Sequence, residues 1–391
     1  MKPREIRKNV YLVGAVDWDR RLFDALIPLP QGTSYNAYVV VGEKKTALID
    51  SVEPSHLGEL EAQLAELPAP DYIVSQHGEQ DHSGSIALLA AKYPQVTVVT
   101  NEKCKAELID HVRVPDGRFR VIADGDSLDL GGKTLTFAFT PWVHWPETMC
   151  TWLPEDKLLF TCDFFGSHLA TSDVYADEAT AYSGAKRYYA EIMMPFAAQV
   201  AKDVEKVAQF PIETICPSHG PLFGRPAFIM DLYREWAGGA PRNVVTLAYV
   251  SMHDTTRLMA DHLTAALAQR SVAVERFELT GADIGDLASS LVDAATVLVG
   301  TPTVLTGPHP AAGYVALLMN TLKPKARQIG IFGSFGWAGK APEKLAELLP
   351  NFKGELLDPV MVKGMPKADG YAALDALADT IAERHQGLAS R

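Results

Sequence analysis

The first part of the chain, up to about residue 240, alternates short apolar runs with turns. β-Branched and aromatic residues dominate the runs NAYVVVG, KTALIDS, DYIVSQH, VTVVT, TLTFAFT, KLLFTCD and TICPSH, which predict strands. Leucines at helical spacing in PSHLGELEAQLAEL predict a helix, and AKRYYAEIMMPFAAQVAKDVEKVAQF predicts a longer helical region interrupted near Pro195. This mixture predicts layered α/β structure.

A segment rich in glycine and proline separates this part from the next. WAGGAPRN, Trp236–Asn243, is typical of a linker. After it, strands alternate with helical stretches, and the predicted strands are NVVTLAYVS, VAVERFEL, ATVLVG, QIGIFGS and GELLDPVMV. Five strands with right-handed crossovers make a doubly wound parallel sheet, which binds ligands beyond the carboxyl ends of its strands. We therefore predict two domains, residues 1–240 and 241–391.

Composition is that of an ordinary soluble protein. The chain has 391 residues and a formal net charge of -12, which argues against nucleic acid as a partner. No apolar run is long enough to cross a bilayer and no secretory signal is evident, so we expect a cytoplasmic protein without membrane contacts. The cysteines are too widely spaced for a disulfide framework or a thiolate metal site, and we interpret Cys104, Cys150, Cys162 and Cys216 as small buried residues.

A dense group of possible metal ligands follows one apolar run. In QHGEQDHSG, which begins at Gln76, two histidines and two acids lie within six residues: His77, Glu79, Asp81 and His82. Such a group is hard to explain as a solvated polar loop, because it directly follows the buried strand predicted for YIVS. The stretch therefore predicts a metal site.

Three further candidates follow other predicted strands. His144 comes after TLTFAFTPWV, Asp163 ends KLLFTCD, and His219 follows TICPS. Alone, such a histidine would more often be structural, and a lone aspartate would more often cap a turn. Because four strand ends can share one edge of a sheet, we expect these side chains to converge with the first group on two metal ions, with Asp163 as the bridging carboxylate.

The types of ligand distinguish between metals. The set combines four imidazoles with three carboxylates, a mixture of nitrogen and hard oxygen that suits iron or manganese. A hydrolytic dizinc site would contain more imidazole and fewer acids. Glu79 stands where hydrolases with the pattern H-x-H-x-D-H carry a second histidine. A dizinc hydrolase with an accessory second domain remains the alternative.

The whole chain resembles the flavodiiron proteins (A-type flavoproteins). The matching stretches are LVGAVDW, GTSYNAY, HGEQDHSG, HWPETM, CDFFGSH, CPSHG, SMHDTTRLMA, GTPT and GSFGWAG, which span nearly its full length. The resemblance implies a metallo-β-lactamase-like αββα sandwich followed by a flavodoxin-like domain with a five-stranded parallel sheet. It also implies one iron bound by His77, Glu79, His144 and Asp163, and a second bound by Asp81, His82, His219 and the same Asp163.

The resemblance implies activity and partners as well. Family members reduce dioxygen to water or nitric oxide to nitrous oxide. They work as head-to-tail homodimers, or as dimers of such dimers, in which the flavin of one subunit lies near the diiron site of the other. No appended C-x-x-C rubredoxin module is present, so we expect a separate electron donor, a rubredoxin or a reductase acting through one. A deazaflavin donor is the second possibility.

Three loops of the second domain predict an FMN site. SMHDTT lies between a strand and its helix, so backbone amides and hydroxyls there could hold a phosphate, although such residues are also common helix caps. GTPTVLTG and GSFGWAG combine glycines with hydroxyls, and Trp337 offers a surface for stacking the flavin ring. The predicted cofactor residues are Ser251, Met252, His253, Asp254, Thr255, Thr256, Pro302, Thr303, Val304, Leu305, Thr306, Gly307, Ser334, Phe335, Gly336, Trp337, Ala338 and Gly339.

Asp254 departs from the pattern of the family, as do His253, Leu305 and Thr306. A carboxylate facing a phosphate at ~4 Å would cost about 4 kcal/mol at an effective dielectric constant near 20. We therefore expect the Asp254 side chain to turn away from the phosphate and to cap the helix, while the hydroxyls face the phosphate.

Overall fold

A computed structural model describes residues 2–390, which form two compact units. The first unit extends to Gly238, and the second begins at Gly239 and includes the short segment Ala190–Pro195. The predicted linker is shorter than expected, because helix α7 (Pro226–Gly238) continues through its first three residues. Trp236 is buried against the ring of Tyr233, and this packing outweighs the low helix propensity of glycine. The division at residue 240 stays a prediction.

Seven strands form the first sheet, in the order β1-β2-β5-β6-β7-β8-β9. Their bounds are β1 (Arg4–Arg7), β2 (Val10–Asp17), β5 (Thr33–Val41), β6 (Thr46–Ile49), β7 (Tyr72–Val74), β8 (Thr97–Thr100) and β9 (Phe119–Val121). The sheet is antiparallel from β1 to β6 and parallel from β6 to β9. A small separate hairpin consists of β3 (Leu22–Phe23) and β4 (Ile27–Pro28).

Five strands form the second sheet, in chain order. They are β10 (Ser127–Asp129), β11 (Thr134–Phe139), β12 (Met149–Leu153), β13 (Leu158–Cys162) and β14 (Thr214–Pro217). β12 is antiparallel to both neighbours, and β13 is parallel to β14. As a result β11, β13 and β14 point in the same direction and end at the same edge of the sheet.

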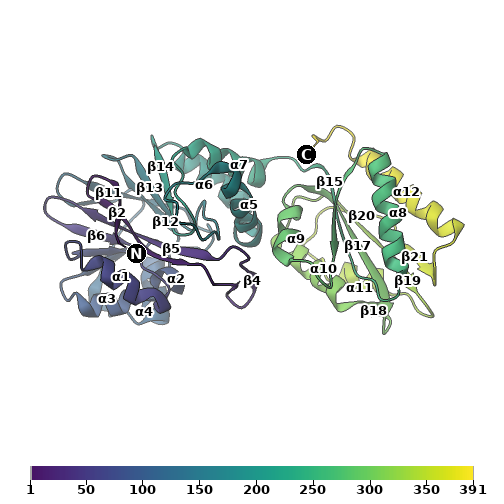
Figure 1. Ribbon diagram of the computed structural model, residues 1–391, viewed down its shortest axis with the longest axis horizontal. Helices are drawn as coiled ribbons and strands as arrows, with labels where there is room; N and C mark the ends of the chain where they lie inside the picture. Colours follow the sequence, from purple (N-terminus) through teal and green to yellow (C-terminus); the bar gives the residue numbers. More distant parts are fainter. Residues whose placement is uncertain (1, 391) are drawn as a thin grey trace. The chain divides into compact units, whose positions relative to one another are not determined.

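Alternation along β5 explains how the layers pack. Tyr38 and Val40 point into the core between the two sheets, whereas Tyr35, Ala37 and Val39 point into the core beneath the helices of the first sheet. Figure 1 shows α1, α3 and α4 beside the first sheet and α5, α6 and α7 beside the second. This arrangement of helix, sheet, sheet and helix layers confirms the predicted sandwich.

The helical segments between residues 2 and 238 are mostly short. Besides α7 they are η1 (Pro54–His56), α1 (Leu57–Leu64), α2 (Gln80–Ser83), α3 (Ile86–Lys92), α4 (Glu102–Val112), η2 (Asp116–Arg118), α5 (Glu178–Tyr188), η3 (Tyr189–Met193), η4 (Met194–Phe196) and α6 (Ala197–Val207). The long predicted helical region is therefore divided by a π-helical turn and a 3-10 turn. Pro195 accounts for the break, because it has no N–H to continue the helical hydrogen bonds.

The second unit contains a parallel sheet in the order β16-β15-β17-β19-β20. Its strands are β15 (Arg242–Tyr249), β16 (Ala273–Glu278), β17 (Ala294–Val304), β19 (Gln328–Phe335), β20 (Glu355–Leu356) and β21 (Val360–Lys363), and β18 (Gly307–Pro308) folds back on β17. This is the order of a flavodoxin-like sheet, as predicted. The expected fifth strand is split into β20 and β21, both paired with β19, because Pro359 lacks the N–H that a continuous strand requires.

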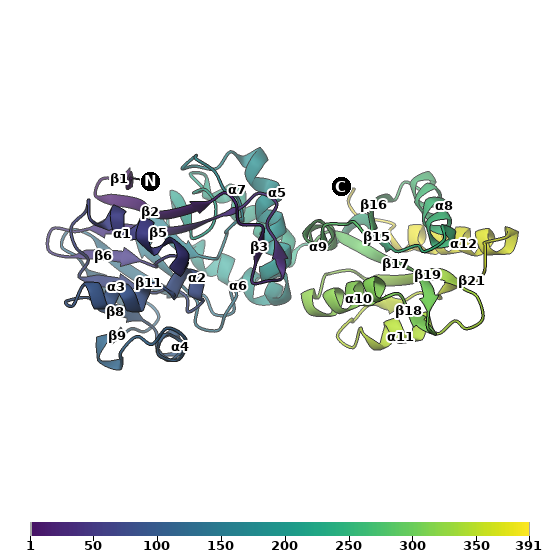
Figure 2. The same cartoon turned by 60° about the horizontal axis from the view of Figure 1, so that its bottom comes forward.

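Helices cover both faces of this sheet. They are α8 (Thr255–Gln269), α9 (Ile284–Leu291), α10 (Pro310–Leu322), α11 (Ala341–Glu347) and α12 (Ala368–Arg384). Figure 2 shows α8 and α12 on one face and α10 and α11 on the other. No helix among residues 2–390 has the length and apolar character needed to cross a membrane.

Candidate functional site

The seven candidate metal ligands lie at one end of the sandwich, Asp81 and His82 in the short helix α2 and the others in loops. His77, Glu79, Asp81 and His82 follow β7, and the other three, His144, Asp163 and His219, follow β11, β13 and β14. The expectation that all four strands share one sheet is wrong, because β7 belongs to the first sheet and the others belong to the second. The side chains still meet, because the two sheets face each other and their loops converge across the layer between them.

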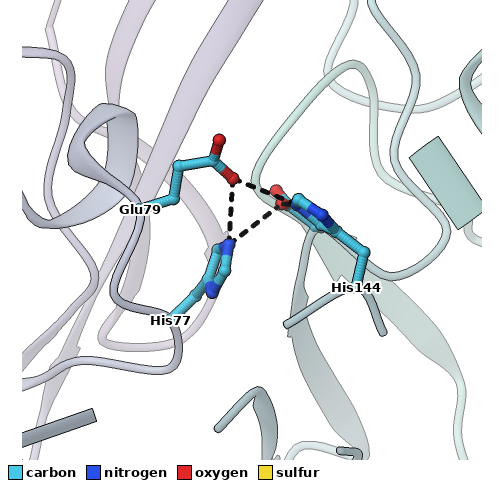
Figure 3. A group of neighbouring side chains, drawn as sticks. His77, Glu79 and His144 are labelled. Carbon is cyan, nitrogen blue, oxygen red and sulfur yellow. Dashed lines mark hydrogen bonds and ion pairs between the residues drawn. The ribbon is translucent and has the colours of Figure 1, made fainter. Parts of the chain in front are cut away.

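The first group consists of His77, Glu79, His144 and Asp163. Nε2 of His77 and Nε2 of His144 each lie 3.0 Å from Oε2 of Glu79. Oδ2 of Asp163 lies 3.1 Å from Nε2 of His144 and 3.6 Å from Nε2 of His77. Figure 3 shows the labelled side chains of His77, Glu79 and His144 pointing toward one another.

The second group consists of Asp81, His82 and His219, and Asp163 also lies close to its two histidines. Nε2 of His82 and Nε2 of His219 each lie 3.1 Å from Oδ2 of Asp81. Oδ1 of Asp163 lies 2.8 Å from Nε2 of His82 and 3.4 Å from Nε2 of His219. Asp163 thus directs one carboxylate oxygen toward each group, which is the geometry required of a bridging ligand.

The donor atoms are suited to cations. Both carboxylate oxygens of Asp81, both ring nitrogens of His82 and Oδ1 of Asp163 are buried and have no hydrogen bond among residues 2–390. A buried polar atom without a partner costs about 1–3 kcal/mol. Because Nε2 of His82 and Oδ1 of Asp163 are close without the alignment of a hydrogen bond, their lone pairs are free to bind a positive ion between them.

Hydrogen bonds from outside the two groups fix two of the imidazoles. Nδ1 of His77 lies 2.7 Å from Oε1 of Glu147, which also accepts a hydrogen bond from the N–H of Gly78. Nδ1 of His219 lies 2.6 Å from the carbonyl oxygen of Ser34 and donates to it. Each contact leaves Nε2 as the acceptor that a metal requires. Sequence reasoning missed Glu147, although the stretch HWPETM contains it.

Charge pairing shifts the pKa values of these groups in the protein without metal. Burial alone would lower the pKa of His77, but its hydrogen bonds to Glu147 and Glu79 raise it well above the ordinary value. For His82, burial is opposed by the charges of Asp81 and Asp163, which raise its pKa to about 9. Burial would raise the pKa of Asp163, but the positive charge of His82 and the hydrogen bond from His144 hold it well below its usual range.

These shifts predict how the metal-free protein responds to pH. Because the pKa of His82 is raised in the folded state to about 9, its protonated form stabilises the fold fully below about pH 6.5, and this stabilisation is lost as the pH rises through about 9. We expect the melting temperature of chelator-treated protein to fall by several degrees between pH 6 and pH 9.5. Scanning calorimetry would measure the change.

The comparison for this prediction is iron binding by the same protein over the same pH interval. Ligands must lose their protons to bind metal, so the affinity for iron should rise as the pH rises from 6 to 9.5. A melting temperature that stays constant in the metal-free protein would contradict the charge pairing described for His82.

A cavity of about 220 Å³ lies at the carboxyl edge of the sheet in the second unit. It is lined by Ser251, Met252, His253, Thr255, Thr256, Pro302, Thr303, Ser334, Phe335, Gly336 and Gly364. All except Gly364 are among the predicted cofactor residues. Gly364 directly follows β21, so the rule that ligands bind beyond strand ends could have identified it.

The remaining predicted cofactor residues do not line this cavity: Asp254, Val304, Leu305, Thr306, Gly307, Trp337, Ala338 and Gly339. Leu305 and Thr306 form the turn of a small hairpin, where both adopt positive φ angles and Val304 pairs with Gly307. Trp337 is 80% exposed. Its role as a stacking surface stays a prediction.

Asp254 behaves differently from the expectation that it caps α8. It precedes the helix in a left-handed conformation with φ 61°, and its side chain makes no cap hydrogen bond. Instead its carboxylate accepts a hydrogen bond from Nε of Arg257 at 2.9 Å, and Oγ of Ser251 accepts the hydrogen bond from the N–H of Arg257. A capping side chain needs an extended backbone at this position, which explains why the capping expectation was wrong.

Two hydroxyls make the cavity suitable for a phosphate. Oγ1 of Thr256 and Oγ1 of Thr303 are buried and have no hydrogen bond partner among residues 2–390. Thr256 lies in the first turn of α8, where backbone N–H groups and the helix dipole attract anions. The chemistry of the cavity is therefore compatible with the phosphate of a flavin nucleotide.

Comparisons with known proteins agree over nearly the whole chain. Residues 33–220 match the family described as ODP family beta lactamase. The chain is 34% identical over 395 residues to the rubredoxin-oxygen oxidoreductase of Megalodesulfovibrio gigas, with 98% of each covered. It is 35% identical over 366 residues to the nitric oxide reductase of Moorella thermoacetica, covering 91% of this chain and 92% of the relative. The crystal structure of the flavodiiron protein from Giardia intestinalis is similar with a TM-score of 0.91 and 28% identity, covering 98% of this chain and 97% of that one.

Proposed function

This chain belongs to the flavodiiron protein family, and on that premise we propose that it reduces dioxygen to water, nitric oxide to nitrous oxide, or both. Electrons from an external donor would pass through FMN to a non-haem diiron site. The observation that carries the proposal is the position of Asp163, whose two oxygens each face one group of histidine and carboxylate ligands.

We propose that His77, Glu79, His144 and Asp163 hold one iron and that Asp81, His82, His219 and Asp163 hold the other. The buried donor atoms without partners support this assignment. When bound, iron would supply one-electron redox chemistry, and FMN would supply electrons singly or in pairs. The donor set also argues against the hydrolase alternative, because Glu79 brings a third carboxylate to the site instead of an additional imidazole.

The side chains around the ligands keep this site ordered. Glu147 and the carbonyl oxygen of Ser34 hold the rings of His77 and His219, so that Nε2 of each ring faces the centre of its group. His77, His82 and His219 are almost fully buried, which excludes bulk water and strengthens electrostatic interactions. A ligand shell that is held in place by these contacts limits the rearrangement that accompanies changes in metal charge.

For FMN, we propose that its phosphate lies at the start of α8 and beside Thr303. Replacing Thr256 with valine keeps the shape of the side chain but removes the buried hydroxyl. We expect FMN to bind about tenfold more weakly, because a hydrogen bond to a charged group contributes about 1.5–3 kcal/mol. Fluorescence titration of flavin-free protein with FMN would measure the change. Thr264→Val is the matched control on the same helix, because the Thr264 hydroxyl instead bonds to the carbonyl oxygen of Ala260.

Asp254 should have little influence on flavin affinity. Its carboxylate is held by Arg257 and does not line the cavity. We expect Asp254→Asn to change the FMN dissociation constant by less than about tenfold, or 1.4 kcal/mol. The same titration measures it, and tightening by several orders of magnitude would show that the carboxylate faces the phosphate.

We also propose a separate electron donor and a head-to-tail homodimer or dimer of such dimers. A rubredoxin, or a reductase acting through one, is the proposed donor, and the name of the Megalodesulfovibrio gigas relative supports it. A deazaflavin donor is the second candidate. Stopped-flow oxidation of reduced rubredoxin and of reduced deazaflavin by the same preparation would distinguish them.

Metal analysis and a visible spectrum of freshly purified protein test the proposed function directly. We expect iron and FMN together, at two ions and one flavin per chain, and consumption of dioxygen or nitric oxide under a reduced donor. A colourless zinc protein would instead favour the hydrolase, and a yellow protein without iron would favour a pure electron carrier.

A further inference from the structure

The second unit has another cavity at the opposite edge of its sheet. The cavity lies beyond the end of α10 and before the start of β19 and β20, whereas the candidate flavin cavity lies at their carboxyl edge. Its volume is about 560 Å³. Pockets for small molecules usually span about 300–1,000 Å³. The cavity is therefore large enough for a ligand of its own.

Positive charge dominates the lining of this cavity. The lining includes Lys323, Lys325, Arg327 and Lys353 and contains no aspartate or glutamate. The chain as a whole has a formal net charge of -12, so this concentration of cations is local. A concave surface lined by charge of one sign focuses its potential and attracts ions of the opposite sign.

Three of these cations, Lys323, Arg327 and Lys353, are not neutralised by neighbouring acids. Within residues 2–390, Lys323, Arg327 and Lys353 form no ion pair. Glu355 is close to Lys353 in the sequence, but it pairs with Arg384 at 3.0 Å. Lys323 also has a simple structural role at the end of α10, where a cation complements the helix dipole. That role does not explain Arg327 and Lys353, which belong to other segments.

The floor of the cavity is apolar. The lining residues Met319 and Ala326 are buried, and Phe352, which also lines the cavity, is half-buried. An inorganic anion gains nothing from such a floor. A ligand that combines an anionic group with a flat or apolar group uses both parts of the cavity.

Backbone hydrogen bonds hold the walls together. The N–H of Arg327 donates to the carbonyl oxygen of Ala295 at 2.7 Å, and the carbonyl oxygen of Arg327 accepts from the N–H of Glu355 at 2.8 Å. Gly354 is required for this close approach, because a Cβ atom there would lie 2.3 Å from the carbonyl oxygen of Arg327. The cavity is thus formed before a ligand arrives, which reduces the entropic cost of binding.

We propose that this cavity binds a phosphate-bearing small molecule of nucleotide size. Its phosphates would pair with Lys323, Arg327 and Lys353, since ammonium and guanidinium groups are the usual partners of phosphate. Its ring would pack on Phe352 and Met319. Nucleic acid fits less well, because the cations line a hollow within an acidic chain and do not form an extended basic stripe.

Titration calorimetry with ADP tests the proposal on the full-length protein saturated with FMN, so that ADP cannot enter the flavin cavity. We expect one ADP per chain and binding at least tenfold tighter than that of adenosine or of inorganic phosphate. Arg327→Ala and Lys353→Ala should each weaken ADP binding at least tenfold. Phe352→Leu should weaken ADP binding while leaving any binding of inorganic phosphate unchanged.

Lys367→Ala is the matched control, because Lys367 is an exposed lysine of the same unit outside this cavity. It should bind ADP as the unaltered protein does. Absence of saturable ADP binding, equal affinities for ADP and inorganic phosphate, or binding unaffected by Arg327→Ala and Lys353→Ala would each overturn the proposal. FMN content and gas reduction are measured on the same samples, so a failure of the proposed function would be seen separately.

Discussion

Replacing Asp163 with alanine is expected to remove both metal positions at once. Among residues 2–390, Asp163 is the one residue whose carboxylate reaches both groups, with Oδ2 3.1 Å from His144 and Oδ1 2.8 Å from His82. We expect iron affinity to fall by more than about 100-fold, because the loss of a direct ligand should exceed the 10–100-fold effect of losing an outer partner. Gas reduction should fall with the iron content. Iron analysis after dialysis against a chelator would measure the loss.

The control for this substitution is a buried carboxylate elsewhere in the same unit. Asp203 is buried on α6, and its burial raises its pKa to about 6. Asp203→Asn should retain iron, and both variants should retain FMN. Full iron content and full activity in the Asp163→Ala protein would remove the basis for the diiron proposal.

Replacing Glu147 with glutamine is expected to weaken iron binding by about 10–100-fold, the usual effect of losing a partner that orients a metal-binding histidine. The carboxylate of Glu147 is buried and lies 2.7 Å from Nδ1 of His77. Its negative charge increases the basicity of the ring and keeps Nε2 directed at the metal position. Glutamine preserves the size of the side chain but not the charge. The rate of iron loss to a chelator, followed by absorbance, would measure the effect.

Glu107 provides the comparison for Glu147. The Glu107 carboxyl has a pKa raised to about 7, by burial first and then by the charge of Glu147, but it makes no ion pair with a ligand histidine among residues 2–390. Glu107→Gln should therefore leave the rate of iron loss nearly unchanged. Equal rates in the unaltered and Glu147→Gln proteins would show that the contact with His77 is structural alone.

Part of the metal site could be predicted from the sequence because several of its ligands lie close together along the chain. His77, Glu79, Asp81 and His82 occur together, and each remaining ligand follows an apolar run that forms a strand. Glu147 was not predictable in this way. It lies 70 positions from His77, and only the packed loops place the two side chains together.

The flavin cavity, too, has features that the sequence predicted and features that it did not. The hydroxyls of SMHDTT follow β15, and those of GTPT lie in the last residues of β17, which is longer than predicted. Their place at a carboxyl edge followed from the alternation of strands and helices. The positive φ angle of Asp254 and its hydrogen bond to Arg257 could not be predicted from the sequence, because an aspartate before a helix is most often an extended cap residue. The turn at Leu305 and Thr306 likewise depends on a hairpin that the sequence pattern did not reveal.

By itself, the sequence determined the layered α/β architecture, the parallel sheet of the second unit and the kinds of ligand available, because side-chain periodicity and ligand chemistry are local properties. Tertiary structure alone decided that the metal ligands come from two facing sheets, that Asp163 directs one oxygen to each group and that Glu147 supports His77. These features depend on distances between residues far apart in the chain, and such distances are set only when the apolar faces of both sheets pack into a common core.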